Sequence, residues 1–165
     1  MSFSLESRVD IYDSNVWVHG LTRKSADAEA RIQEIIDNKR CVLVTPYIYE
    51  EVDQAIQRDS DNQQAADELR DRFAQMMSNP FISDPNHQEV SDVDLDTVRS
   101  DPTVQAFAEV LEIQAKDIPI LQAAQQCSNP NPTIFTNDED FYELSERKER
   151  YNLGRIEFEY VEYPK

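Results

Sequence analysis

The sequence predicts an α/β fold, a three-layer α/β/α sandwich with a mostly parallel central sheet. Two observations lead to this prediction. Short apolar runs typical of buried strands alternate with longer segments whose apolar residues recur at helical spacing. The chain of 165 residues also contains no internal repeat or low-complexity linker. We therefore expect one domain over 1–165, burying roughly two-thirds of the surface that the unfolded chain would expose.

The first half of the chain predicts strands that are each followed by helices. The alternating run at 8–12 is typical of a strand and ends at Asp13. The run at 41–45 is apolar until Thr45, as expected for a strand covered on both faces of a parallel sheet. Capping residues and apolar spacing predict helices over 25–38, from Pro46 onward, and over 61–77.

The second half is less regular. Residues 79–101 are rich in Pro, Asp, Asn and Ser, which predicts a loop with a short strand near Glu89 and Val90. Helical spacing then resumes with Phe107, Val110 and Leu111 as the apolar face. The remaining elements we expect are a helix capped by Asp117, a strand at 133–136, a helix to about 150, and a strand at 155–163.

The charge balance is strongly acidic, with 33 Asp and Glu against 16 Lys and Arg and a formal net charge of −17. This balance argues against a generic nucleic-acid binder, because neutralising phosphates requires a basic surface. The acids are spread along the whole chain, so they predict a solvated surface. We interpret them as a halophilic adaptation, since the Debye length falls to about 3 Å at 1 M salt. An ordinary acidic protein is the alternative.

The composition also bears on where the protein works. No run of 18 apolar residues predicts a membrane span, and the first ten residues lack the apolar region of a secretory signal. Cys41 and Cys127 lie far apart in apolar or small surroundings, so we expect buried free thiols in a reducing compartment. The sequence therefore predicts a cytoplasmic protein without membrane contact.

A few acids stand at junctions between strands and helices, where the ligands of parallel sheets bind. They are Asp13 after the first strand, Glu51 early in the helix after the second, Asp117 at a helix start, and Asp138 and Asp140 after the strand at 133–136. Each also has a structural interpretation as an N-cap, a turn residue or a surface acid. Their shared position at one sheet edge favours a common site.

Four converging carboxylates would repel one another, each pair at about 4 Å by up to about 4 kcal/mol at an effective dielectric of 20. A divalent cation removes that repulsion. Oxygen ligands favour Mg²⁺ or Mn²⁺ over zinc, and His19 and His87 have no second His or Cys at ligand spacing. The sequence thus predicts a magnesium or manganese site.

Four segments together resemble the motifs of the PIN domain, a family of metal-dependent ribonucleases that includes toxins of prokaryotic toxin–antitoxin pairs. They occur in the family's order and span most of the chain: YDSNVWV at 12–18, TPYIYEEV at 45–52, AKDIPILQAA at 115–124 and TNDEDF at 136–141. Each motif alone is weak, whereas the ordered set is fairly specific.

The resemblance implies roles for particular residues. The implied metal ligands and catalytic acids are Asp13, Glu51, Asp117 and Asp138, with Asp140 as an additional or alternative ligand. Thr136 would be a polar neighbour of the site, and Ser14 and Asn15 would hold the first loop. Glu50 is an alternative to Glu51, which spacing favours because Glu51 shares a helix face with Ile48.

The resemblance also implies an activity and partners. The protein would be a Mg²⁺- or Mn²⁺-dependent endoribonuclease that hydrolyses phosphodiester bonds of single-stranded or structured RNA. An antitoxin protein and a second copy in a homodimer are further expected partners. Apart from the resemblance, the scattered basic residues that are candidates for phosphate contact are Arg70, Arg72, Lys116 and Arg147. The alternative is a PIN-like module that binds partners in RNA processing or ribosome assembly without efficient catalysis.

Overall fold

The structure, a computed structural model, describes residues 8–163 and is mixed α/β. Its strands form two parallel sheets. The larger sheet has the order β1-β4-β5, with bounds Ile11–Tyr12, Thr133–Thr136 and Glu157–Tyr160. The smaller pairs β2 with β3, which span Val42–Leu43 and Ile82–Ser83. A parallel bridge between Asp10 and Val42 joins the two sheets, so β1 lies between β2 and β4.

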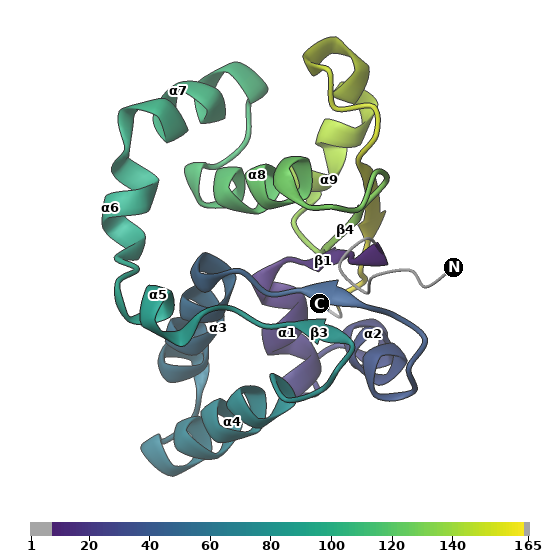
Figure 1. Cartoon of the computed structure of the whole chain (residues 1–165). Coiled ribbons are helices and arrows are strands. Elements are labelled where there is room, and N and C mark those ends of the chain that lie inside the picture. The colour runs from purple at the N-terminus through teal and green to yellow at the C-terminus, as the bar shows by residue number, and fades with distance from the viewer. Residues whose placement is uncertain (1–7, 164–165) are drawn as a thin grey trace.

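Helices connect these strands and lie on both sides of them (Figure 1). The first half contains α1 (Ser14–Leu21), α2 (Ala26–Ile36), α3 (Pro46–Asp59) and α4 (Gln63–Met76). The second half contains α5 (His87–Ser91), α6 (Leu95–Ser100), α7 (Pro102–Leu111), the 3₁₀ turn η2 (Ala115–Asp117), α8 (Ile118–Gln126) and α9 (Glu139–Glu143). In the view of Figure 1, α8 and α9 lie above the strands and α1 and α2 below them.

The predicted helices of the first half are confirmed, and local chemistry explains them. Ser25 caps α2 by accepting a hydrogen bond from the Ala28 amide, and Thr45 caps α3 in the same way. Pro46 occupies the first turn of α3, where its missing N–H costs nothing. One face of α3 is buried in full, and Glu51 shares it with Ile48 as predicted: Tyr47, Ile48, Glu51, Val52, Ala55 and Ile56.

An aromatic cluster fixes the end of β1 against the neighbouring elements. The Trp17 ring on α1 lies 5.3 Å from both the Tyr12 and the Phe73 ring centroids, and Tyr12 lies 5.2 Å from Phe135 on β4. All four side chains are essentially inaccessible to solvent. Tilted and edge-to-face pairs of this kind each add about 0.5–1.5 kcal/mol beyond their area burial. The carboxyl end of β1 is therefore held rigidly.

The predicted loop at 79–101 is wrong. The segment contains β3, α5 and α6, and Glu89 and Val90 lie in helix α5, not in a strand. Side-chain caps explain these short helices, because Asn86 accepts from the Gln88 and Glu89 amides and Asp94 accepts from the Thr97 amide. The polar residues that predict a loop here are the caps of successive helices.

Three smaller predictions need correction. On α7, Phe107 and Val110 are exposed at 49% and 60%, and the buried face is instead formed by Val104, Ala108 and Leu111. The predicted helix to about 150 is only α9 followed by 3₁₀ turns at Leu144–Glu146 and Lys148–Tyr151. Cys41 is a buried free thiol as expected, whereas Cys127 is half-buried.

Within residues 8–163, no helix combines the length and the apolar composition needed to cross a membrane.

Candidate functional site

Asp13 lies where β1 gives way to α1, and its position follows from the strand register. Tyr12 pairs with Phe135 on β4, and the Asp13 amide donates to the Phe135 carbonyl at 2.8 Å. This pairing places the Thr136 hydroxyl beside the Asp13 carboxylate, to which it donates a 2.8 Å hydrogen bond. Asp13 is buried and makes no capping hydrogen bond to the described backbone of α1. Its carboxylate is therefore turned toward the Ser14 and Thr136 hydroxyls and not toward the helix backbone.

Glu51 approaches Asp13 from α3. The Ser14 hydroxyl donates to Oε1 of Glu51 at 2.6 Å and lies 3.4 Å from Oδ1 of Asp13. Glu51 is 8% exposed, whereas the neighbouring Glu50 accepts an exposed hydrogen bond from Gln54 on the same helix. Of the two adjacent acids, Glu51 is thus the one that faces Asp13. Asn15 follows on α1 and is half-buried.

Asp117 ends η2 and directly precedes α8, in the position of an N-cap. Its side chain nevertheless makes no capping hydrogen bond to the described backbone, and it is 1% exposed. The buried Oδ2 atom has no hydrogen-bond partner within residues 8–163. An unsatisfied buried carboxylate oxygen costs about 1–3 kcal/mol or more, so this atom requires an explanation.

Asp138 is connected to Asp13 by way of the Thr136 hydroxyl, which contacts both residues. Its amide donates to the Thr136 hydroxyl oxygen at 3.0 Å, while its carboxylate caps α9 by accepting from the amides of Asp140 and Phe141. The structural interpretation therefore holds for Asp138, alongside any role in the site. Asp140 is exposed on the first turn of α9.

The electrostatics show that these acids lie near one another. Burial raises the pKa of Asp13 to about 6, with further repulsion from Glu51 and Asp138, against the Thr136 hydrogen bond and the Lys116 charge. Burial also raises the pKa of Asp117 to about 9, with added repulsion from Asp13, Asp138 and Glu51 and partial relief from Lys116. The four predicted acids thus form one mutually repelling cluster.

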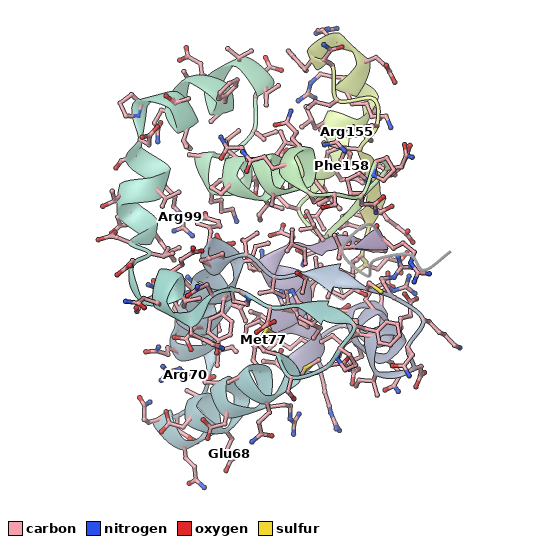
Figure 2. The ribbon with its side chains drawn as sticks, viewed as in Figure 1. Glu68, Arg70, Met77, Arg99, Arg155 and Phe158 are labelled. Atoms are coloured by element: carbon pink, nitrogen blue, oxygen red, sulfur yellow. The ribbon has the colours of Figure 1, made fainter. Side chains whose placement is uncertain are left out.

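Arg99 on α6 is a site residue that the sequence analysis missed. Its guanidinium donates to Oε2 of Glu51 at 2.7 Å and to the Tyr47 hydroxyl at 3.1 Å. Tyr47 in turn donates to the Lys116 carbonyl at 2.8 Å, and its oxygen lies 3.2 Å from Oε2 of Glu51. Figure 2 shows Arg99 extending from α6 toward α3. The apolar spacing of Leu95 and Val98 behind a capping Asp94 was the signal for this helix.

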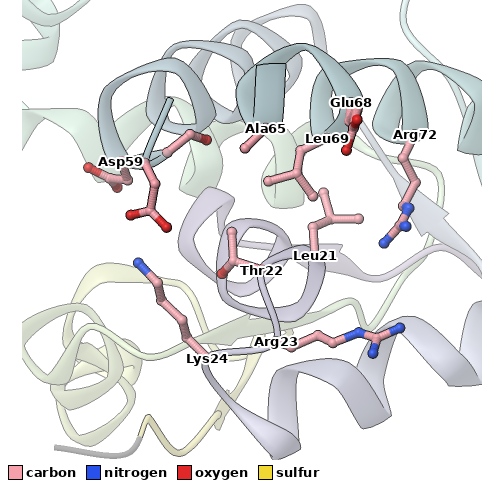
Figure 3. A pocket seen from close by; sticks show the side chains of 11 residues that line it. Leu21, Thr22, Arg23, Lys24, Asp59, Ala65, Glu68, Leu69 and Arg72 are labelled. Atoms are coloured by element: carbon pink, nitrogen blue, oxygen red, sulfur yellow. The ribbon is translucent and has the colours of Figure 1, made fainter. Parts of the chain in front are cut away.

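The four basic residues predicted to contact phosphate do not gather at the acid cluster. Lys116 is half-buried beside Asp117 and acts on the acid cluster. Arg70 pairs with Asp53 at 2.7 Å, and Arg147 donates to the Leu111 carbonyl. Arg72 lines a separate pocket of about 330 Å³ between the end of α1 and α4, shown in Figure 3. The lining of that pocket includes none of the four acids.

The donor set fits a hard divalent cation such as Mg²⁺ or Mn²⁺. All of its ligand atoms would be carboxylate oxygens, and the unpartnered Oδ2 of Asp117 is an oxygen that a cation would satisfy. Within residues 8–163, no group of three or more His, Cys, Asp or Glu side chains lies close enough together to hold a metal ion. The Glu51 carboxylate is instead paired with Arg99 at 2.7 Å.

The fold and the site define a mixed α/β protein with a buried cluster of carboxylates at the carboxyl edge of a parallel sheet. Comparison of the chain with models of known protein families, with curated proteins and with solved structures finds no match. The chemistry of the cluster is therefore the basis on which a function is assigned.

Proposed function

We propose that the protein is a Mg²⁺- or Mn²⁺-dependent endoribonuclease of the PIN type. One observation carries the proposal. Asp13 and Asp117 both occupy N-cap positions and are buried, yet neither caps the described backbone of its helix. Natural proteins retain buried, mutually repelling acids mainly where function requires them. The ordinary structural explanation for these two acids is thus removed.

The fold supports the finer architecture in this proposal. Parallel strands with helices on both sides are what a three-layer α/β/α sandwich of the PIN type requires (Figure 1). The central position of β1 brings Asp13 to the middle of the sheet edge, as expected for a ligand site of a parallel sheet.

In this proposal each acid would have a stated role in binding the cation or the attacking water. Asp13 and Asp117 hold the cation, with Asp138 as a further or water-mediated ligand, and Glu51 binds the cation or orients the attacking water. When bound, the cation supplies a water of lowered pKa and neutralises charge on the phosphate. Ser14 and Thr136 keep the carboxylates of Glu51 and Asp13 in place.

The acidic surface would repel RNA phosphates, so RNA binding would depend on screening by salt and on basic side chains close to the site. Lys116 and Arg99 are the basic side chains that act directly on the acid cluster. We expect weak binding of single-stranded or looped RNA, whose phosphates can enter a narrow site more easily than those of a regular helix. An antitoxin protein and a second copy of the chain remain proposed partners.

The test is cleavage of a single-stranded RNA by wild type and Asp117→Asn with Mn²⁺ at high salt. The variant should lose activity at least about a hundredfold, the usual scale for a lost electrostatic contribution to catalysis. Glu51→Gln with Glu50→Gln forms a matched pair on one helix, and only the former should fail. Equal cleavage by wild type and Asp117→Asn would refute the proposal. Mn²⁺-independent RNA binding without cleavage would favour a binding module.

A further inference from the structure

Both oxygens of the Glu51 carboxylate already accept hydrogen bonds, one of them from Arg99. Oε2 of Glu51 accepts the 2.7 Å hydrogen bond from Arg99, and Oε1 is occupied by the Ser14 hydroxyl at 2.6 Å. The Glu51 end of the pair is enclosed, since its side chain is only 9% exposed. A carboxylate oxygen that accepts from a guanidinium is a poorer metal ligand, because its charge is already partly neutralised. Ion pairing and coordination at this oxygen therefore compete.

Arg99 has an anchor that does not depend on Glu51. Its Nε donates to the Tyr47 hydroxyl, which is itself held by the Lys116 carbonyl. The Arg99 backbone is also fixed, because its carbonyl accepts a hydrogen bond from the Gln105 side chain on α7. The guanidinium can thus leave Oε2 of Glu51 while its other end stays at the rim of the site.

The guanidinium is also suited to bind a phosphate. Its side chain is 32% exposed, so it is reachable from solvent beside the buried acids. A guanidinium carries five N–H donors in a planar fork that matches phosphate oxygens, and the contacts to Glu51 and Tyr47 engage only two of them. In a protein with a net charge of −17, a cation at the opening of the site is where an RNA phosphate would find attraction.

We propose that Arg99 exchanges partners, pairing with Glu51 in the metal-free protein and with an RNA phosphate once a divalent cation has taken Glu51. Arg99 is then a positioning residue for the phosphate and a competitor that lowers the affinity of the site for metal. This inference rests on the proposed nuclease function, which it deepens by naming the side chain that receives the substrate.

The metal arm of the test is calorimetric titration of Mn²⁺ alone into the full chain. Arg99→Gln should bind Mn²⁺ about tenfold more tightly than wild type, a change of about 1.4 kcal/mol. Arg70→Gln is the matched control, because Arg70 pairs with Asp53 of the same helix α3 at the same 2.7 Å without contacting Glu51. Both arginines are labelled in Figure 2. Arg70→Gln should leave Mn²⁺ affinity unchanged.

The substrate arm is the steady-state kinetics of single-stranded RNA cleavage at saturating Mn²⁺. Arg99→Gln should raise KM about tenfold with a smaller change in kcat, and Arg99→Lys should recover only part of the loss because it keeps the charge but not the planar fork. Unfolding curves for each variant establish that the protein is folded before either arm is interpreted.

The outcomes separate the two proposals. Mn²⁺ binding that Asp117→Asn abolishes but Arg99→Gln leaves unchanged would overturn the partner exchange and keep the nuclease site. Tighter Mn²⁺ binding with an unaltered KM would also overturn it, since Arg99 would then compete for Glu51 without receiving RNA. Failure of the wild type to bind Mn²⁺ at all would refute the nuclease proposal itself.

Discussion

The Ser14 hydroxyl donates a 2.6 Å hydrogen bond to Oε1 of Glu51, linking the first turn of α1 to the second turn of α3. Because both groups are buried, loss of the hydroxyl would leave an acidic oxygen without its donor. We expect Ser14→Ala to lower the free energy of unfolding by about 1–2 kcal/mol and to reduce kcat for RNA cleavage. Chemical denaturation measures the first effect. Ser78→Ala, which removes an exposed hydroxyl from the end of α4, should have neither effect.

The raised pKa of Asp117 makes the stability of the metal-free protein depend on pH. Folded Asp117 keeps its proton up to about pH 9, whereas the unfolded side chain loses it near its ordinary value of 3.8. Stability should therefore fall as pH rises between these values. Asp117→Asn cannot lose a proton, so in EDTA it should exceed wild type by roughly 2 kcal/mol in weakly alkaline buffer. Parallel denaturation curves of the two proteins at all pH values would contradict this.

Metal affinity should rise with pH, whereas the stability of the metal-free protein falls. A cation must displace the proton of Asp117 below about pH 9, and that of Asp13 as well below about pH 6. Each displaced proton makes the Mn²⁺ association constant rise about tenfold per pH unit. Calorimetry in buffers of different ionisation enthalpy counts the protons released, and we expect one near neutral to weakly alkaline pH. Affinity that is constant over that range would exclude protonated Asp117 as a ligand.

Asp138 caps α9 and is also a proposed ligand of the cation. Two substitutions at this position can distinguish the two roles. Asp138→Asn preserves a side-chain oxygen for the amides of Asp140 and Phe141, so it should reduce Mn²⁺-dependent cleavage with little loss of stability. Asp138→Ala should lose activity and also about 1 kcal/mol of stability. Asp140→Asn, on the exposed first turn of α9, should change both properties least. A larger activity loss in Asp140→Asn than in Asp138→Asn would reverse the assignment of these two acids.

Salt should stabilise the whole chain. With a net charge of −17, repulsion among surface acids opposes the compact state, and screening removes most of it. We expect Tm to rise by roughly 5–10 °C between about 0.2 M and 2 M KCl. Thermal unfolding followed by circular dichroism measures this, with sucrose as an uncharged control. A Tm that is flat or falling in KCl would contradict the halophilic interpretation.

The sequence predicts the start of α3 and the face shared by Ile48 and Glu51 because several signals agree there. Thr45, Pro46 and the apolar spacing all define the same start and the same buried face. The strand at 133–136 is predicted equally well. In contrast, α5 and α6 have five and six residues, so each offers at most one apolar pair at helical spacing, which is a weak signal within a polar segment. Arg99 was missed for that reason.

The candidate site was predictable in composition but not in geometry. An Asp before a helix looks the same in sequence whether its carboxylate caps the helix or turns into the protein. Only the direction of the side chain separates Asp13 and Asp117, which do not cap, from Asp138, which does. The sequence also could not predict that Glu51 is the acid paired with an arginine, because Glu51 and Arg99 are 48 positions apart.

The pairing of Ile11 with Ile134 has a consequence for how the protein is made. These neighbours are separated by most of the chain, so β1 lacks β4 until the ribosome has passed residue 136. A growing chain already carries Asp13, Glu51 and Asp117 before that point, but not the Thr136 hydroxyl that holds Asp13. A chain interrupted between residues 117 and 136 would therefore carry these three acids without the hydrogen bond that holds Asp13.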